Sequence, residues 1–176
     1  MYSNLKEKIL NIKKEKDAII LAHYYQTPEV QDIADAVGDS FYLSKLAKEN
    51  KNSTIVLCGV KFMAESAKIL SPEKTVLLPV LNAGCPMADM VDADKLIDFK
   101  NKHKNAKVVT YINSSTEIKA LSDVCCTSSN ALKIIENIDS DEIIFLPDKN
   151  LGEYIKEKVS NKNIILWQGF CPVHRQ

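Results

Sequence analysis

The sequence has few glycines and lacks the glycine-rich loops that bind nucleotides. Only five glycines occur among 176 residues, and they form neither a Gly-x-x-x-x-Gly-Lys-Ser/Thr loop nor a Gly-x-Gly-x-x-Gly turn. A Gly-x-Ser-x-Gly elbow is absent too. Nucleotide binding through such loops is therefore not supported, and an anion site would have to be built from helix N-termini.

Long apolar runs and an excess of one charge are lacking as well. The longest apolar runs, 18–22 and 76–81, are the size of strands, whereas a transmembrane helix needs about 20 residues. The first eight residues lack the apolar core of a signal peptide. The 23 basic and 23 acidic residues cancel, which leaves no electrostatic footprint for nucleic acid or an anionic membrane. We expect a cytoplasmic protein with neither of these partners.

The cysteines do not suggest a disulfide framework. Five are present, an odd number, and Cys125 and Cys126 are neighbours that cannot easily pair. Reduced thiols favour metal, catalytic or core roles. Cys58 lies in an apolar run and is expected in the core. The Cys125-Cys126 pair either packs under the helix that begins near Ser129 or brings a sulfur to the site, and we favour packing.

Two cysteines are each followed by proline just past an apolar run. They are Cys85, in Asn-Ala-Gly-Cys-Pro-Met, and Cys171, in Gly-Phe-Cys-Pro-Val-His. Thiolates are soft ligands suited to zinc or iron–sulfur clusters, so the two corners are predicted to converge on one metal site. His174 follows Cys171 at a Cys-x-x-His spacing. It is either a zinc ligand or a contact to substrate or to another ligand.

Apolar runs rich in β-formers alternate with segments of helical period. The expected strands are 18–22, 54–58, 75–81, 107–112, 142–146 and 163–167. The expected helices are 28–37, one beginning after 38–40, 62–70, 92–103, 116–124, 129–138 and 151–159. Strands that alternate with helices predict an α/β fold with parallel sheets covered on both faces.

The two halves of the chain look like copies of one unit. Three pairs of landmarks are 88 positions apart and the Cys-Pro corners are 86 apart: His23 and Tyr111, Tyr25 and Asn113, Ser40 and Ser128, Cys85 and Cys171. The agreement of these offsets predicts a duplicated α/β domain. We place the first repeat at 1–92 and the second at 93–176.

The polar landmarks follow strands, where parallel sheets bind ligands. His23 with Tyr24 and Tyr25 suits acid–base or hydrogen-bonding work, although a lone histidine is more often structural. Tyr111 and Asn113 are two positions apart on a strand, so their side chains share a face and can point at one ligand. They can equally be a core tyrosine and a turn asparagine.

Ser40 and Ser128 each precede a helical run. Serine is a common N-cap because its hydroxyl accepts a bond from an unpaired amide. Helix N-termini also bind carboxylate or phosphate, and the matched positions of the two serines favour that second interpretation. The segment 148–152 follows a strand and either contacts a ligand or simply starts a helix.

Together these motifs resemble those of the quinolinate synthases, iron–sulfur enzymes of NAD biosynthesis. The resemblance runs from 19 to 174 and rests on these segments: Leu21-Ala22-His23-Tyr24-Tyr25-Gln26, Gln31-Asp32-Ile33-Ala34-Asp35, Gly38-Asp39-Ser40, Cys85-Pro86-Met87-Ala88, Tyr111-Ile112-Asn113-Ser114, Cys126-Thr127-Ser128-Ser129-Asn130-Ala131, Pro147-Asp148-Lys149-Asn150-Leu151-Gly152 and Cys171-Pro172-Val173-His174. No single segment would suffice, but the set is specific.

The resemblance implies three three-layer αβα domains with small parallel sheets around a pseudo-threefold axis. Each domain would give one cysteine to a [4Fe-4S] cluster whose fourth iron is open to substrate, with Cys85 and Cys171 as two of the ligands. The reaction would condense iminosuccinate with dihydroxyacetone phosphate to quinolinate, releasing phosphate and water, with a functional link to L-aspartate oxidase. The implied iminosuccinate contacts are His23, Ser40, Tyr111, Ile112, Asn113 and Ser128. His23, Tyr25 and Tyr111 are the implied catalytic residues.

A third repeat would place another cysteine about 86 residues after Cys171, yet the sequence ends at Gln176. We therefore expect a chain truncated after two of three repeats that binds a cluster poorly alone. Two other interpretations stay open. One is another cluster-dependent hydro-lyase, or a zinc enzyme using Cys85, Cys171 and His174. The other is a non-catalytic α/β module that binds a dicarboxylate.

Overall fold

The computed structural model describes residues 2–173, with side chains from Asn4 onward. The chain forms two compact units, Met1–Ala83 and Gly84–Gln176, called here the N-terminal and C-terminal units. They part nine residues before the boundary placed from the sequence. Val91 belongs to a core cluster of the C-terminal unit, so the segment after Ala83 already packs with the second half of the chain.

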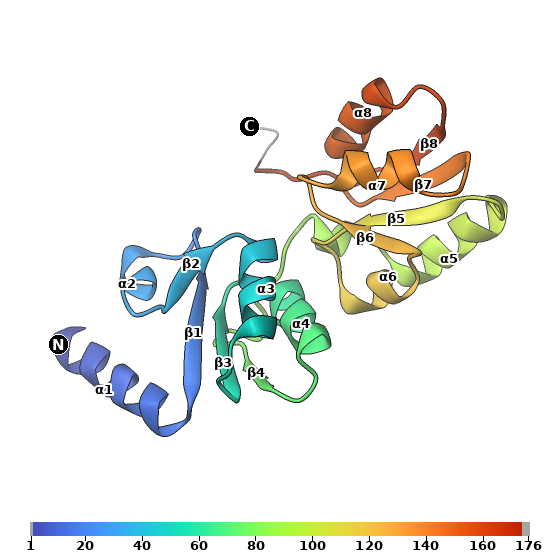
Figure 1. Ribbon diagram of the computed structural model, residues 1–176. Helices are drawn as coiled ribbons and strands as arrows, with labels where there is room; N and C mark the ends of the chain where they lie inside the picture. The colour runs from blue at the N-terminus through green and yellow to red at the C-terminus, as the bar shows by residue number, and fades with distance from the viewer. Residues whose placement is uncertain (1, 174–176) are drawn as a thin grey trace. The chain divides into compact units, whose positions relative to one another are not determined.

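The N-terminal unit is a four-stranded parallel sheet with helices (Figure 1). Strand β1 is buried along all six of its residues, as expected for a strand in the interior of a parallel sheet. The strand order is β2-β1-β3-β4. The elements are α1 (Tyr2–Glu15), β1 (Ala18–His23), α2 (Pro28–Gln31), β2 (Ala36–Gly38), α3 (Ser40–Glu49), β3 (Thr54–Cys58), α4 (Lys61–Leu70) and β4 (Thr75–Leu77).

The C-terminal unit has the same design, with strand order β6-β5-β7-β8. One core cluster lies beneath α7 and α8 and the other beneath α5 and α6, on opposite faces of the sheet (Figure 1). This is the predicted three-layer αβα arrangement. The elements are η1 (Ala88–Met90), α5 (Ala93–Lys102), β5 (Lys107–Tyr111), α6 (Thr116–Ala120), β6 (Val124–Cys126), α7 (Ala131–Asn137), β7 (Glu142–Leu146), α8 (Lys149–Lys158) and β8 (Asn163–Leu166).

The two units repeat one pairing scheme at an offset of 88. In the N-terminal unit Leu21 pairs with Ala36, and in the C-terminal unit Val109 pairs with Val124. The pairing of β3 with β4 and that of β7 with β8 are related by the same offset. The periodicity seen in the sequence is therefore a periodicity of backbone hydrogen bonding.

Two expected helices are too long, because each runs into a strand that was not predicted. Helix α2 ends at Gln31 and is followed by β2, and α6 ends at Ala120 and is followed by β6. The cause is an aspartate just before each strand. Asp35 Oδ2 accepts the Ile20 amide at 2.8 Å, and Asp123 Oδ2 accepts the Val108 amide at 2.8 Å. These bonds attach the chain to the neighbouring strand and stop the helix.

Two further differences concern the ends of the N-terminal unit. Helix α1 was not predicted, and β4 ends at Leu77 rather than at position 81. Val80 and Leu81, expected to be in that strand, are exposed in the loop that follows it, with 57% and 81% of their surface accessible. The apolar run there reflects a loop and not a buried strand.

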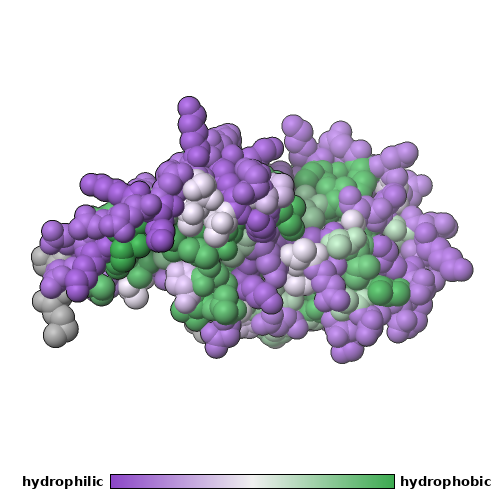
Figure 2. All heavy atoms as spheres, turned by 90° about the horizontal axis from the view of Figure 1, so that it is seen from below, coloured by the Kyte–Doolittle hydropathy of each residue, from purple (hydrophilic) through white to green (hydrophobic). Residues whose placement is uncertain are grey.

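The surface agrees with the balanced charge of the sequence. Figure 2 shows polar side chains over most of one face, with apolar patches between them. Among the described residues no helix combines the length and apolar character needed to cross a membrane.

A buried lysine caps the C-terminal end of helix α3, and its substitution should lower the stability of the N-terminal unit. Lys74 Nζ donates to the Ala47 carbonyl at 2.7 Å and also to the carbonyl of Asn50, near the helix C-terminus. We expect Lys74→Met to lower the free energy of unfolding of the N-terminal unit by about 2–3 kcal/mol, because buried carbonyls lose a charged donor. Urea unfolding followed by circular dichroism measures this.

Trp167, the one tryptophan of the chain, lies in the C-terminal unit, so its fluorescence serves as the control. In Lys74→Met the unfolding transition seen by this fluorescence should occur at the same urea concentration as in the unchanged protein. Lys162→Met offers the matched change, because Lys162 Nζ donates to the Ile138 and Ser140 carbonyls after α7. In Lys162→Met the unfolding transition seen by Trp167 fluorescence should shift to a lower urea concentration. Equal shifts from both variants would contradict the assignment of each lysine to its own unit.

Candidate functional site

The predicted site residues lie where strands end. His23 is the last residue of β1 and Tyr111 the last residue of β5. Ser40 follows β2 as the first residue of α3, and Ser128 lies between β6 and α7. Each pair of residues therefore sits at the carboxyl edge of its own sheet, where open parallel sheets bind ligands.

His23 is held by its neighbours in the N-terminal unit. Its ring stacks on Tyr24, with centroids 4.4 Å apart, and lies 4.5 Å from the ring of Tyr25. Nδ1 accepts the backbone N–H of Tyr25 at 3.2 Å. Burial lowers the pKa of His23, an effect that the nearby charge of Asp39 partly opposes. The imidazole is thus biased toward its neutral form at pH 7.

The two serines do not cap their helices, contrary to the simple interpretation of the sequence. The N-cap of α3 is Asp39, whose Oδ1 accepts the Tyr42 amide at 2.8 Å. Asn130 is at the N-cap position of α7, and its Oδ1 accepts the amide of Thr127 at 2.7 Å. Ser40 is the first residue of α3, and Ser128 precedes α7. Because neither serine is the N-cap, the hypothesis that both contact a ligand remains.

Tyr111 is the centre of the polar cluster in the C-terminal unit. Burial raises the pKa of its phenol to about 12, a rise that a hydrogen bond with Ser128 partly offsets and that the nearby Asp148, Cys126 and Cys171 increase. The phenol is therefore a proton donor and not a phenolate at pH 7. Tyr111, Ser128 and Cys171, predicted separately from the sequence, are close enough to influence one another.

The segment that follows Tyr111 is fixed by hydrogen bonds to backbone carbonyls. The Ile112 amide donates to the Cys126 carbonyl at 2.8 Å, and the Ser114 hydroxyl donates to the Tyr111 carbonyl at 3.0 Å. Ile112 and Asn113 are both half-buried. The predicted Tyr-Ile-Asn segment thus forms a fixed turn at the end of β5.

Asp148 lies in the 148–152 segment, for which the sequence left both a ligand contact and a helix start open. It is 5% exposed, and its Oδ1 accepts the Asn150 amide at 3.0 Å as the N-cap of α8. It also forms an isolated parallel bridge with Gly169. The signal was present in the Pro-Asp-Lys-Asn-Leu-Gly segment, but a helix start explained that segment equally well.

The two cysteines occupy equivalent places in the repeat. The first N–H of α4 donates to the Ala83 carbonyl, and the first N–H of α8 donates to the Gly169 carbonyl, both at 2.8 Å. Cys85 and Cys171 each follow two residues later. Since Ala83 and Gly169 are 86 positions apart, the shorter cysteine offset reflects a loop two residues shorter in the second repeat. Both cysteines are half-buried.

Gly169 should resist substitution because a side chain there has no room. A Cβ at this position would lie 2.5 Å from the carbonyl oxygen of Pro147. We expect Gly169→Ala to destabilise the C-terminal unit by about 1–3 kcal/mol, as overpacking typically does. Trp167 fluorescence during urea unfolding measures it. Ala83→Gly is the matched reverse change at the equivalent position and should cost about 1 kcal/mol or less.

Residues around Met90 connect the two cysteine segments within the C-terminal unit. The Trp167 indole Nε1–H donates to the Met90 carbonyl at 3.1 Å, and the Phe170 amide donates to Met90 Sδ at 3.4 Å. Met90 comes five residues after Cys85, and Phe170 directly precedes Cys171. The chain that follows one cysteine is therefore bonded to the chain that precedes the other.

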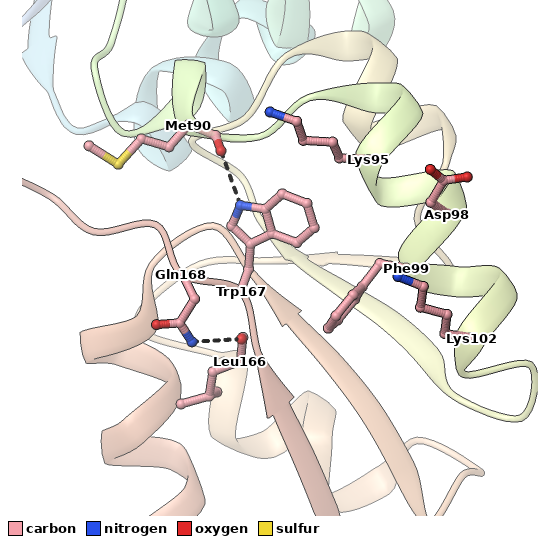
Figure 3. Close-up of a pocket in the computed structure, with 8 residues that line it drawn as sticks. All are labelled: Met90, Lys95, Asp98, Phe99, Lys102, Leu166, Trp167 and Gln168. Atoms are coloured by element: carbon pink, nitrogen blue, oxygen red, sulfur yellow. Dashed lines mark hydrogen bonds between the residues drawn. The ribbon is translucent and has the colours of Figure 1, made fainter.

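A pocket lies beside this connection but contains none of the predicted site residues (Figure 3). Its floor is Trp167, whose ring meets Phe99 edge-on with centroids 5.7 Å apart. Lys95 and Lys102 from α5 stand at its rim. The indole N–H already donates to the Met90 carbonyl, and the pocket lies between α5 and residues 166–168.

The thiols fit a soft metal site only in part. Among residues 2–173 no three His, Cys, Asp or Glu side chains form a group that could hold a metal ion. Cys126 is buried in the core as expected, and burial raises the pKa of its thiol to about 12. Burial also raises the thiol pKa of Cys58 and Cys125. Neither lies in the core as expected, because Cys58 is only half-buried and Cys125 is exposed. Cys85 and Cys171 therefore remain as candidate ligands, and His174 lies outside the described residues.

Known proteins match nearly the whole chain. Residues 7–176 match the family described as Quinolinate synthetase A protein. The quinolinate synthase of Clostridium acetobutylicum is 71% identical over 174 residues, which is 99% of this chain and 57% of that protein. The quinolinate synthase of Clostridioides difficile is 61% identical, and that of Alkaliphilus metalliredigens 58%, with the same coverage. The chain thus spans a little over half the length of these relatives. It belongs to the quinolinate synthetase A family.

Proposed function

We propose that this chain supplies two of the repeats of a quinolinate synthase, which condenses iminosuccinate with dihydroxyacetone phosphate to form quinolinate and releases phosphate and water. Iminosuccinate would come from an L-aspartate oxidase, and the protein would work in the cytoplasm. The observation that carries the proposal is the matched pair of strand-end sites. His23 and Ser40 recur as Tyr111 and Ser128 on an identical strand-pairing scheme.

In this proposal Cys85 and Cys171 are two ligands of a [4Fe-4S] cluster. Such a cluster, when bound through three thiolates, supplies an open iron that acts as a Lewis acid toward a hydroxyl or carbonyl oxygen. Two thiolates do not make a full ligand set, so the described residues alone should hold a cluster weakly. The matched loop positions of the two cysteines support their role.

The residues of this chain would bind and orient the dicarboxylate. The neutral His23 and the protonated phenol of Tyr111 can both donate hydrogen bonds to carboxylate or carbonyl oxygens. Ser40 at the start of α3 and Ser128 before α7 add hydroxyl donors near helix N-termini, where anions are stabilised. The turn formed by Ile112 and Asn113 would line one side of the site around Tyr111. Tyr25, with 70% of its surface exposed, would move a proton between substrate and solvent.

A fusion protein tests the proposal. It joins this chain to the part of the Clostridium acetobutylicum relative that the chain does not cover. After anaerobic reconstitution with iron and sulfide, we expect a cluster absorbance and quinolinate formation from dihydroxyacetone phosphate and enzymatically generated iminosuccinate. The unfused chain should show little of either. A folded fusion that binds zinc in preference to iron, or that binds iron and sulfide without forming quinolinate, would overturn the proposal.

A further inference from the structure

The turn that follows β1 fixes the imidazole of His23 in one chemical form. The Gln26 amide donates to the His23 carbonyl at 2.9 Å, and the Tyr25 amide donates to His23 Nδ1 at 3.2 Å. An imidazole nitrogen that accepts an N–H carries its lone pair and no proton. In a neutral ring the proton must then be on Nε2.

The shape of this turn depends on Gln31, a residue of the Gln31-Asp32-Ile33-Ala34-Asp35 segment. Its side-chain Nε2 donates to the Tyr24 carbonyl at 3.1 Å and to the Gln26 carbonyl at 2.7 Å. These two carbonyls flank the Tyr25 amide. The last residue of helix α2 therefore bonds back to the turn that precedes the helix, in which the Tyr25 N–H points at the ring.

The groups around the ring agree with a neutral form. Tyr24 stacks on one side at an interplanar angle of 27°, and Tyr25 packs at 54°. The residue is 9% exposed, and burial disfavours the imidazolium. Asp39 is the nearby negative charge that favours protonation, and burial outweighs it. Since Nδ1 is occupied by the Tyr25 amide, Nε2–H is the group left to meet a ligand.

We propose that Gln31 and the 24–26 turn lock His23 as a neutral Nε2–H donor, so that His23 polarises or binds a substrate oxygen and does not act as a general base. Gln31 is then a positioning residue that works through the turn. The proposal rests on the proposed function only for the identity of that oxygen, which would belong to iminosuccinate. Proton removal in the reaction falls to other groups.

Nitrogen NMR of the ¹⁵N-labelled 176-residue chain tests the lock without substrate or cluster. The chain has three histidines, His23, His103 and His174, and His23→Gln assigns the signals. At pH 7 we expect His23 Nδ1 at the shift of a bare nitrogen and Nε2 at that of a protonated one. His103 provides contrast, because its Nδ1 faces Glu142 Oε1 at 3.6 Å. Averaged, reversed or imidazolium shifts for His23 would overturn the proposal.

Two variants of similar size test the part played by Gln31. Gln31→Met and Gln31→Glu both remove the amide donors, and either should move the His23 signals toward tautomer averaging. Gln168→Met is the matched control, since Gln168 Nε2 donates to the Leu166 carbonyl in the other unit. It should leave His23 unchanged. The backbone amide spectrum shows whether each variant folds. Unchanged His23 signals in a folded Gln31 variant would refute its role.

The fusion protein then links the lock to turnover. Gln31→Met should raise KM for iminosuccinate about tenfold, the size expected when one hydrogen bond to a charged group is misaligned. KM for dihydroxyacetone phosphate should stay the same. A fusion that makes no quinolinate would count against the proposed function and leave the NMR result standing. A Gln31→Met variant whose His23 signals are averaged but whose KM for iminosuccinate is unaltered would overturn the link between the turn and substrate binding.

Discussion

Changing Cys85 or Cys171 to serine in the fusion protein should abolish stable cluster binding and lower quinolinate formation by at least about a hundredfold. Changes to residues that merely support a metal ligand already cost about 10–100-fold, and a direct ligand should exceed that. Serine keeps the size of cysteine but offers a hard hydroxyl that is protonated at neutral pH, whereas iron–sulfur clusters require soft thiolates. Iron and sulfide content, the visible absorbance and the rate of quinolinate formation measure the effect.

The other cysteines provide controls for this result. Cys125→Ser changes an exposed thiol and Cys58→Ser a half-buried one, and burial raises the thiol pKa at both positions. Both variants should retain cluster and activity, with at most a modest loss of stability for Cys58→Ser. A Cys85→Ser or Cys171→Ser protein that keeps a full cluster would contradict the ligand assignment. Loss of the cluster in Cys125→Ser would contradict it as well, because a different thiol would then be a ligand.

The sequence predicts the central strands and the repeat because both depend on local pattern. Strand β1 is a run of five apolar residues that ends in His23, and it is buried at every position. Most of β7 is likewise apolar and buried. The landmarks 88 positions apart mark strand ends and helix starts, and these recur because the strands pair in the same register. The strand-end location of His23 and Tyr111 follows from these two features.

The short edge strands could not be predicted in the same way. β2 and β6 have three residues each, which is too few to show a period. They form because Asp35 and Asp123 bond to strands 15 residues earlier in the chain. The nearness of Asp148 to Tyr111 could not be predicted for a related reason. It arises from the pairing of β5 with β7 and not from any local spacing.

Phe145→Ala should be the most damaging core substitution in the C-terminal unit, with a loss of about 3–5 kcal/mol in the free energy of unfolding. Phe145 is completely buried in β7. The helix above it cannot fill the space, because α8 contacts the ring through Gly152, where even a Cβ would lie 2.9 Å from Phe145 Cδ1. The void therefore persists, and the cost should fall toward the upper end of the range. A typical domain has only about 5–15 kcal/mol of stability.

The expected result is a C-terminal unit that unfolds at much lower urea concentration, followed by the fluorescence of Trp167. This unit carries Tyr111, Ser128 and Cys171. Ligand binding by the site around Tyr111 should therefore be lost at the urea concentration at which the unit unfolds. Tyr154→Ala is the matched control: it removes an aromatic ring from α8 that is 53% exposed, and its effect should stay within about 0.5 kcal/mol. If both variants unfold at the same urea concentration, Phe145 does not support the core, and the packing of α8 on β7 is wrong as described.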